Sequence, residues 1–416
     1  MNTVEASRYA LGLFQGVALY VGAVLGTGML VLPAVAADTA GPASILAWLA
    51  LIGISFPMAL TYAALSRDRR DGSGFSGAIE RAFGSEWGGV AGWLYLAQLP
   101  TGSVVAVLIA GEYAASVVGG GRTAAFALGE GLVVLAFVLN IAGLRASTLA
   151  QFLSLAAITL GMAAIVGPAL GHLDRSAFVP FAPHGAPAIA AAAVPLFWAF
   201  VGWEAITPLA GEFRDAHDIW RASQLAVVVV GALYVALAVA TVGTHAYGQR
   251  LGSQTPLVHM AAGIFGRWAA LVVGAAGFVL SFAPINVYTA GMSRLACALG
   301  RRRQLPEWLG VAAPSGTPRH ALIVLGALCV LGAVASYEAA WSLAALLSLS
   351  ASSFIATYVL SMAAGVRLLE PPLRYAALIS LVACVVVLMF VGPLLGWLGA
   401  VTVCALAYQR WARRTA

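Results

Sequence analysis

Two glycines in the triplet Gly26-Thr27-Gly28 interrupt the first long apolar stretch of this chain, which runs from Leu11 to Val35. A helix in hydrocarbon must pair every backbone N–H and C=O internally, because each orphan group costs several kcal/mol there. A break at that depth is stable where a polar solute or ion takes up the freed groups. A second break of this kind, Phe200-Val201-Gly202-Trp203, lies in a later apolar stretch. Together the two breaks predict a membrane transporter.

The composition limits the fold to one integral membrane unit without a soluble domain. Of the 416 residues, 61% are hydrophobic and 9% are charged, whereas an ordinary soluble domain carries roughly 25% charged residues. A span takes roughly 20 apolar residues, which leaves room for twelve helices and short loops. The expected fold is an all-α membrane protein with spans at Leu11–Ala36, Ala43–Leu65, Trp87–Val118, Thr123–Leu144, Thr148–Leu170, Ala186–Ala210, Ala222–Ala246, Trp268–Leu299, Ala321–Ala335, Ala340–Val366, Tyr375–Val391 and Pro393–Tyr408.

The basic residues predict the orientation in the membrane. All 22 are arginines, and most fall in the loops on one side of the predicted spans. Because cytoplasmic loops carry an excess of basic residues, we expect both termini in the cytoplasm. The arginines expected on the outside are Arg122, Arg175, Arg250 and Arg267. Membrane orientation also explains the net charge of +6 better than a nucleic-acid partner does.

The position of the breaks indicates an internal repeat. The broken first helix is matched five helices later by the broken sixth, and five helices per repeat invert the second copy in the membrane. We therefore expect a ten-helix transport core over residues 1–370, with helices one to five at about 9–171 and helices six to ten at about 186–368. Residues 371–416 then form two peripheral helices and a cytoplasmic C-terminus.

The two breaks suit the two ends of a zwitterionic amino acid. The half-helix that starts near Met29 presents free amides and partial positive charge to a carboxylate, and the Thr27 hydroxyl adds a donor. The first half of helix six ends in unpaired carbonyls, so Ala199, Phe200 and Val201 are predicted to accept from the ammonium group. The alternative is that the glycines only allow close helix packing.

Several further residues complete the predicted substrate site. Ala23 and Gly202 flank the two breaks, and Trp198 is predicted to line the side-chain pocket together with Phe200. Asn286 in helix eight is either a pocket residue or one partner of an interhelical hydrogen bond. Since no charged residue has an obvious place against a substrate side chain, an apolar amino acid is favoured over arginine, lysine or a polyamine.

Two carboxylates are candidates for coupling or gating. Glu204 follows the second break, and an acidic residue inside a span is a functional candidate, although it also suits the cap of a half-helix. Glu112 is predicted to face Glu130 and to share a proton with it. A sodium site needs several oxygen ligands, and Ser281 has no second hydroxyl residue beside it. A proton is therefore favoured over sodium as the coupling ion.

The order of the motifs resembles the amino acid–polyamine–organocation superfamily of permeases over nearly the whole chain. The matching pieces are Gly22 to Pro33 in the first helix, Gly41-Pro42, Trp48, Gly72-Ser73-Gly74, Ala82-Phe83-Gly84, Phe197 to Glu204, Gly211-Glu212-Phe213 and Ser293-Arg294-Leu295. The resemblance implies a LeuT-type fold of 5+5 inverted repeats with discontinuous helices one and six. It also implies that the residues at the two breaks hold the α-carboxylate and α-amino groups of the substrate.

Two departures from the family pattern concern details of the site. Asp215-Ala216 stands where relatives carry Asn-Pro, and the acidic residue of many relatives late in helix two is missing at Ala64-Leu65. Helix five, Thr148–Leu170, has no ionisable side chain, so the lysine that some relatives protonate there has no counterpart.

The expected function is secondary active transport of small apolar amino acids such as methionine, leucine, isoleucine and valine. Length and the sixth helix most resemble bacterial exporters of methionine and branched-chain amino acids, which implies proton-coupled efflux across the bacterial inner membrane. An importer or an exchanger of the same fold stays open, and a channel, a receptor or a membrane enzyme is a remote alternative. No cofactor, metal or nucleic-acid partner is expected, because the histidines lack metal-ligand spacing; the oligomeric state is not predicted.

Overall fold

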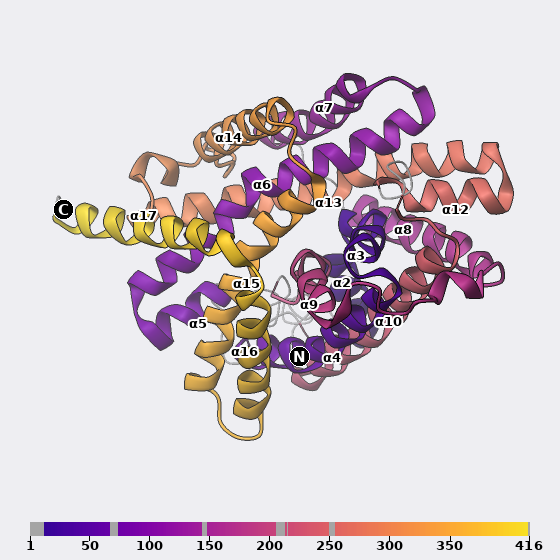
Figure 1. The fold of residues 1–416 in the computed structure, drawn as a ribbon. Coiled ribbons are helices and arrows are strands. Elements are labelled where there is room, and N and C mark those ends of the chain that lie inside the picture. The colour runs from indigo at the N-terminus through magenta and orange to yellow at the C-terminus, as the bar shows by residue number, and fades with distance from the viewer. Residues whose placement is uncertain are drawn as a thin grey trace, which may run out of the picture.

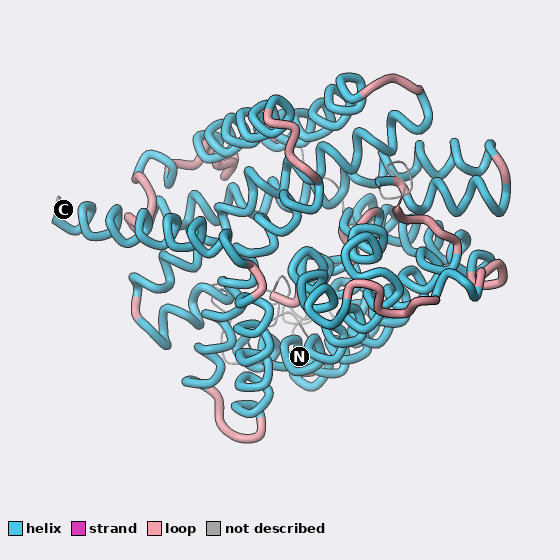
Figure 2. The backbone as a smooth tube through the Cα atoms, viewed as in Figure 1, coloured by secondary structure: helices cyan, strands magenta, loops and turns pink. Residues whose placement is uncertain are grey.

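The computed structural model describes residues 12–66, 74–143, 148–204, 213, 215–248 and 254–414. Within these ranges the regular elements are helices, and Figure 2 draws no strand. In the described part of the chain, eight helices are long and apolar enough to cross a membrane, as judged by length and composition: Leu32–Ser66, Ser85–Val118, Arg122–Ile141, His217–Gly243, Arg267–Arg301, Arg319–Glu338, Leu343–Leu368 and Gly392–Arg414. The predicted all-helical membrane architecture is confirmed, while the count of twelve spans stays a prediction.

Each predicted span range contains a helix. The elements of the first half are α2 (Leu13–Val24), η1 (Thr27–Leu30), α3 (Leu32–Ala40), η2 (Gly41–Ala43), α4 (Ser44–Ser66), α6 (Ser85–Val118), α7 (Arg122–Ile141) and α8 (Thr148–Ala169). Those of the second half are η3 (Arg175–Phe178), α9 (Gly185–Leu196), η4 (Phe197–Phe200), α10 (Ala216–Gly243), α13 (Arg267–Arg301), η6 (Glu307–Gly310), α14 (Arg319–Glu338), α15 (Leu343–Leu368), α16 (Leu373–Met389), η7 (Gly392–Leu394) and α17 (Leu395–Arg414).

Within the described residues, two helices lie between the predicted spans and were not predicted. They are α5 (Gly74–Phe83), which packs against α6 and α15, and α12 (Pro256–Phe265), which packs against α13 and α8. Each has 10 residues, which is too short to cross roughly 30 Å of hydrocarbon. They therefore pack beside the longer helices without adding spans.

Helix α6 is at the centre of the helical packing. It contacts α7, α13, α14, α15 and α17, and Figure 1 shows it crossing the molecule beside α13. Glycine permits the closest of these approaches: a Cβ on Gly111 would lie 2.1 Å from the carbonyl oxygen of Ala125, and one on Gly129 would lie 2.0 Å from that of Val107. Small residues allow helices in membranes to pack this closely.

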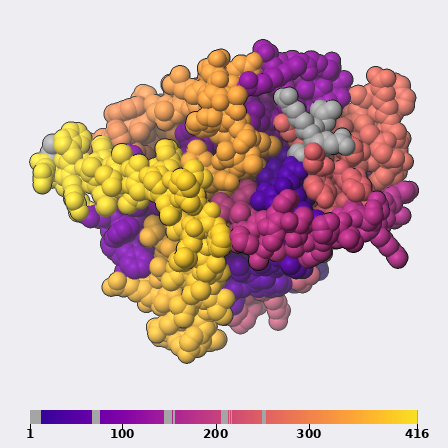
Figure 3. All heavy atoms as spheres, viewed as in Figure 1, coloured from indigo at the N-terminus to yellow at the C-terminus, as the bar shows by residue number. Residues whose placement is uncertain are grey.

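The first, broken helix lies inside the molecule. Its residues Thr27 to Ala37 are buried throughout, and the indigo N-terminal segment is visible only in small areas of the space-filling view (Figure 3). The C-terminal pair α16 and α17, in yellow, lies on the outside in the same view. The segment that carries the first break is therefore enclosed by later helices.

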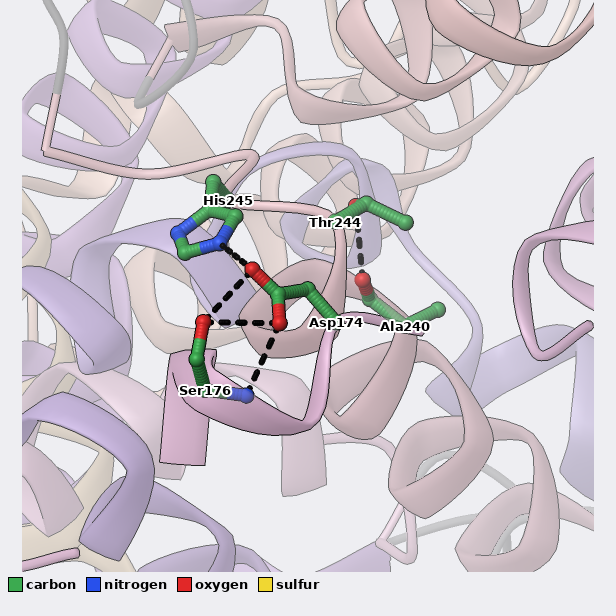
Figure 4. Close-up of polar contacts among 5 residues, drawn as sticks. All are labelled: Asp174, Ser176, Ala240, Thr244 and His245. Atoms are coloured by element: carbon green, nitrogen blue, oxygen red, sulfur yellow. Dashed lines mark hydrogen bonds and ion pairs between the residues drawn. The ribbon is translucent and has the colours of Figure 1, made fainter. Parts of the chain in front are cut away.

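A polar cluster joins the segment before α9 to the end of α10 (Figure 4). The Asp174 carboxylate accepts hydrogen bonds from the backbone N–H of Ser176 at 2.8 Å and from its hydroxyl at 2.7 Å, and it lies 3.0 Å from Nε2 of His245. The Asp174 N–H donates to the Gly243 carbonyl at 2.8 Å. Chiefly because of the His245 contact, and then of Ser176, the pKa of Asp174 is lowered to about 2.

Candidate substrate site

The predicted break in the first helix is present. Helix α2 ends at Val24, Leu25 leaves helical geometry with φ −74° and ψ 82°, and Gly26 is extended with φ −98° and ψ −167°. The short helix η1 then begins at Thr27, and its N-cap residue, Gly26, has no side chain to cap the first amides. The first N–H groups of a helix have no intrahelical acceptor, so η1 presents free donors at the break.

The two glycines of this break have different surroundings. No atom of the described residues lies within 4 Å of a Cβ built on Gly26, whereas a Cβ on Gly28 would lie 2.8 Å from Cδ1 of Trp198 and 2.7 Å from Cδ1 of Leu32. Gly26 therefore faces open space. Gly28 allows the Trp198 ring to approach the backbone. This is the close-packing role that the sequence offered as the alternative to a substrate-binding role.

The second break follows η4. Val201 is extended with φ −79° and ψ 139°, and Gly202 has φ +129°, a conformation that a side chain strongly disfavours. A Cβ on Gly202 would lie 2.6 Å from the carbonyl oxygen of Ala23. The two breaks are therefore in direct contact. Residues 205–210, the remainder of the predicted sixth helix, lie outside the described residues, as do Gly211 and Glu212.

Tyrosine hydroxyls form hydrogen bonds with backbone carbonyl groups at the two breaks. The Tyr234 hydroxyl on α10 lies 3.0 Å from the carbonyl oxygen of Ala199 and 3.2 Å from that of Val24. The Tyr358 hydroxyl lies 3.5 Å from the carbonyl oxygen of Phe200. The Val24 carbonyl also accepts from the N–H of Gly26 at 2.9 Å. A hydroxyl has one proton and a carbonyl has two lone pairs, so the Ala199 carbonyl can accept a further hydrogen bond, and the Val24 carbonyl can do so when the Tyr234 proton points to Ala199.

One cavity, of about 60 Å³, adjoins both breaks. Seven residues of the predicted substrate site line it: Ala23, Gly26, Thr27, Gly28, Trp198, Ala199 and Val201. The rest of the lining comes from Val24 and from α6, α7, α10 and α13: Gln98, Leu99, Gly102, Ser103, Ala106, Val133, Phe137, Tyr234, Pro284, Ile285, Tyr288 and Thr289. The surface is mostly apolar, with a few hydroxyls and one amide.

Three predicted site residues lie outside this lining. Phe200 packs between Trp48 and Tyr234, with ring centroids 5.8 and 5.5 Å away, and Gly202 packs against the first break. Asn286 accepts a hydrogen bond from Nδ2 of Asn140 on α7 at 2.7 Å. Asn286 thus makes the interhelical hydrogen bond that was the alternative to a pocket role.

A second, more apolar cavity of about 260 Å³ lies on the other side of the first break. It is bounded by η1, α8, α12 and α13, and it shares Gly26, Thr27 and Pro284 with the first cavity. Ser281 lines it, but its hydroxyl donates to the Gly277 carbonyl at 2.6 Å. The lining offers few oxygen atoms, whereas a sodium site needs several.

Glu204 is 3% exposed and anchors the turn after the second break. Its carboxylate accepts from the N–H of Gly202 at 3.0 Å and from the hydroxyl of Tyr95 at 3.2 Å, and it forms a short hydrogen bond with Tyr358. Tyr62 packs edge-on against Tyr358, with centroids 5.1 Å apart. This carboxylate connects the second break to α6 and α15.

The predicted facing of Glu112 and Glu130 is wrong. Since Gly111 lies against Ala125 and Gly129 against Val107, the register puts the two carboxylates about six residues, or roughly 9 Å, apart along the helix pair. The amide nitrogen of Gln254, turned toward Glu112, donates to both carboxylate oxygens at 3.0 and 3.1 Å. The Glu130 oxygens are buried without a hydrogen-bond partner in the described part of the chain.

Sequence reasoning missed four polar residues at this site, namely Gln98, Tyr95, Tyr234 and Tyr358. Gln98 carries a usable signal, because it is a polar side chain inside an apolar helix. The tyrosines carry none, since membrane tyrosines are common at interfaces and in packed cores. Only the folded arrangement shows that their hydroxyls reach the breaks.

Comparison with known proteins identifies the family of the chain. The family model for amino acid permeases matches residues 11–408. The chain is 33% identical over 384 residues to the uncharacterized amino acid permease YecA of Bacillus subtilis (strain 168), covering 91% of this chain and 90% of that protein. It is 30% identical over 389 residues to the L-methionine/branched-chain amino acid exporter YjeH of Escherichia coli (strain K12), covering 92% of each. The branched-chain amino acid permease BcaP of Bacillus subtilis (strain 168) is 24% identical over 348 residues, 79% of this chain and 75% of that protein.

The chain therefore belongs to the amino acid permease family. The predicted membership of the amino acid–polyamine–organocation superfamily is confirmed. The relatives carry the names of permeases, transporters and an exporter, and none of those named here is called an enzyme.

Proposed function

We propose that this permease is a secondary active transporter of small apolar amino acids, working by alternating access and proton-coupled efflux. The observation that carries the proposal is the contact between the two breaks, with Gly202 against Ala23 and one cavity beside both. Opposite ends of helix dipoles then face each other across a small space. Such a space suits a molecule with a carboxylate at one end and an ammonium at the other.

The substrate carboxylate binds the free amides at the start of η1. Thr27 and Gly28 supply these N–H groups, and no hydrogen bond of the Thr27 side chain is found in the described part of the chain, so its hydroxyl is available as a further donor. Gly26 leaves open space for the carboxylate oxygens. The ammonium group binds the carbonyls of Ala199 and Val24, which it shares with the Tyr234 hydroxyl.

The substrate side chain lies against the apolar part of the cavity. Trp198, Val133, Phe137 and Ile285 line it, and none of the lining residues carries a charge. A cationic or anionic side chain would lose its hydration there without a partner, which costs several kcal/mol. The names of YjeH and BcaP, which specify methionine and branched-chain amino acids, support the same substrate class.

Glu204 is the proposed proton-dependent gate. Its carboxylate holds the turn at Gly202 and the hydroxyls of Tyr95 and Tyr358. Protonation removes one acceptor from this cluster and weakens the connection between the second break and helices α6 and α15. Glu112, which lines neither cavity, remains a second candidate for proton coupling.

The wider architecture is part of the proposal. We propose twelve spans, with a 5+5 inverted repeat over residues 1–370 and peripheral helices over 371–416. We also propose cytoplasmic termini in a bacterial inner membrane. The helix positions and the arginine distribution support this architecture. The exporter name of YjeH favours efflux. A proton-coupled importer or an exchanger is the alternative, since direction follows the gradients and the coupled ion.

Counterflow in proteoliposomes tests the function. Vesicles preloaded with unlabelled methionine or leucine are expected to accumulate the same labelled amino acid, and vesicles preloaded with arginine or glutamate are not. A pH gradient is expected to change net flux, whereas a sodium gradient is not. Counterflow with charged amino acids alone would contradict the proposal.

A further inference from the structure

Gln98 places a neutral amide in the wall of a mostly apolar cavity. The side chain is 3% exposed and lines the cavity together with Trp198, Leu99 and Ile285. An amide moved out of water is destabilising unless hydrogen bonds replace the water it loses. The partners of this amide therefore determine what the cavity can bind.

The hydrogen bonds of the Gln98 side chain leave capacity unused. Nε2 lies 2.9 Å from the thioether sulfur of Met292, which is a weak acceptor. Oε1 lies 3.5 Å from the Ser350 hydroxyl, at the limit of a hydrogen bond. A primary amide has two donor hydrogens, and the second has no partner in the described part of the chain.

The Trp198 ring connects this amide to the first break. At one end of the indole, Cδ1 lies 2.8 Å from a Cβ built on Gly28, and at the other, Cη2 lies 2.7 Å from one built on Gly102. Oε1 of Gln98 lies 2.9 Å from the Cβ position built on Gly102. An amino acid anchored at the first break, with its side chain along the indole, points its end toward the Gln98 amide. The amide oxygen faces this point in the structure, and a half-turn of the amide away from Met292 brings Nε2 and its hydrogens to the same place.

We propose that Gln98 contacts the end of the substrate side chain and selects an uncharged side chain with a hydrogen-bond acceptor at that position. Methionine, with its thioether, is such a substrate. This inference rests on the proposed function and specifies its substrate. The contact with Met292 demonstrates that the amide can approach a thioether sulfur closely. A substrate thioether takes the same kind of bond, whereas leucine, isoleucine and valine have no acceptor to offer.

Methionine and norleucine make the test specific, because they differ only in sulfur against CH₂. In counterflow with the full-length protein, unlabelled methionine is expected to compete with labelled leucine roughly two- to fivefold better than norleucine does, as one weak hydrogen bond allows. In Gln98→Leu this ratio is expected to fall to about one, whatever the change in the overall rate of exchange.

Met292→Leu provides the opposite change. It removes the internal thioether that competes for the Gln98 amide, so the methionine-to-norleucine ratio is expected to rise above that of the wild type. An unchanged ratio in Gln98→Leu overturns the inference; if that variant does not fold, an unchanged or lower ratio in Met292→Leu does so. Absence of leucine and methionine exchange in the wild type would contradict the proposed function itself, which is a separate result.

Discussion

Gly202 and Ala23 touch through their backbones, since a Cβ on Gly202 would lie 2.6 Å from the carbonyl oxygen of Ala23. Two segments almost 180 residues apart in sequence therefore meet where each helix is interrupted. Gly202 also has φ +129°, so both its conformation and its contact depend on the missing side chain. The predictions below follow from this meeting point and from the groups around it.

Gly202→Ala is expected to destabilise the permease strongly. Backbone strain alone contributes about 1–3 kcal/mol, and the methyl group would also push the two breaks apart. Gly84→Ala is the matched control, because Gly84 has φ +92° but nothing within 4 Å of its Cβ position. Thermal unfolding in detergent is expected to show a larger loss for Gly202→Ala than for Gly84→Ala, and equal losses would argue against the contact.

Tyr234→Phe is expected to lower stability without substrate and to increase the stabilisation that substrate gives. The change leaves the Ala199 carbonyl without its hydroxyl donor, at about 1–3 kcal/mol for an unsatisfied buried group, whereas the Val24 carbonyl keeps the hydrogen bond from the N–H of Gly26. A bound ammonium group then restores the lost hydrogen bond. Ligand-induced shifts in unfolding temperature measure this, with the exposed Tyr375→Phe as control; a shift no larger than that of the wild type contradicts the assignment of the ammonium site.

Glu204→Gln is expected to flatten the pH dependence of transport. The amide oxygen still accepts from Gly202, but the side chain no longer titrates, so the cluster with Tyr95 and Tyr358 stops responding to protons. Initial rates between pH 5 and 8 provide the measurement. Glu80→Gln, at a half-exposed residue paired with Arg302, is the control. If the pH dependence of transport in Glu204→Gln matches that of the wild type, the Glu204 carboxylate has a structural role alone and is not the proton-dependent gate.

Asp174→Asn is expected to remove a pH-dependent contribution to stability. The pKa of Asp174 is lowered from 3.8 to about 2, so its carboxylate stabilises the fold fully above roughly pH 4 and loses that effect as the pH falls toward 2. The wild type is therefore expected to unfold at a higher temperature than the variant at pH 7, with the difference shrinking below pH 4. A difference that does not vary with pH means that the ionised carboxylate is not the stabilising form.

The sequence predicts the helices and both breaks because each depends on local information. Long apolar runs determine where helices form, and the glycines at positions 26 and 202 mark the interruptions. The register between helices is not local. The pairing of Glu112 with Glu130 was mispredicted because which residues of α6 and α7 face each other depends on packing at Gly111 and Gly129.

The polar partners inside the site were also beyond local prediction. Tyr234 reaches two carbonyls from different helices, and Asn286 binds Asn140 across α7 and α13. Each contact joins segments far apart in the chain, so neither residue type nor spacing identifies it. Gln98 is the exception, since a lone amide in an apolar helix is visible in the sequence itself.

The most direct test of the central claim is substrate binding by Gly26→Val. Nothing lies within 4 Å of a Cβ at Gly26, so the variant is expected to insert and fold while its side chain fills the space for the carboxylate. Gly53→Val is the matched control, since Gly53 has equally open surroundings on the exposed face of α4. We expect Gly26→Val to lose counterflow of methionine and leucine at least tenfold, about 1.4 kcal/mol, with Gly53→Val near wild type. Normal counterflow by Gly26→Val would contradict a substrate site at the paired breaks.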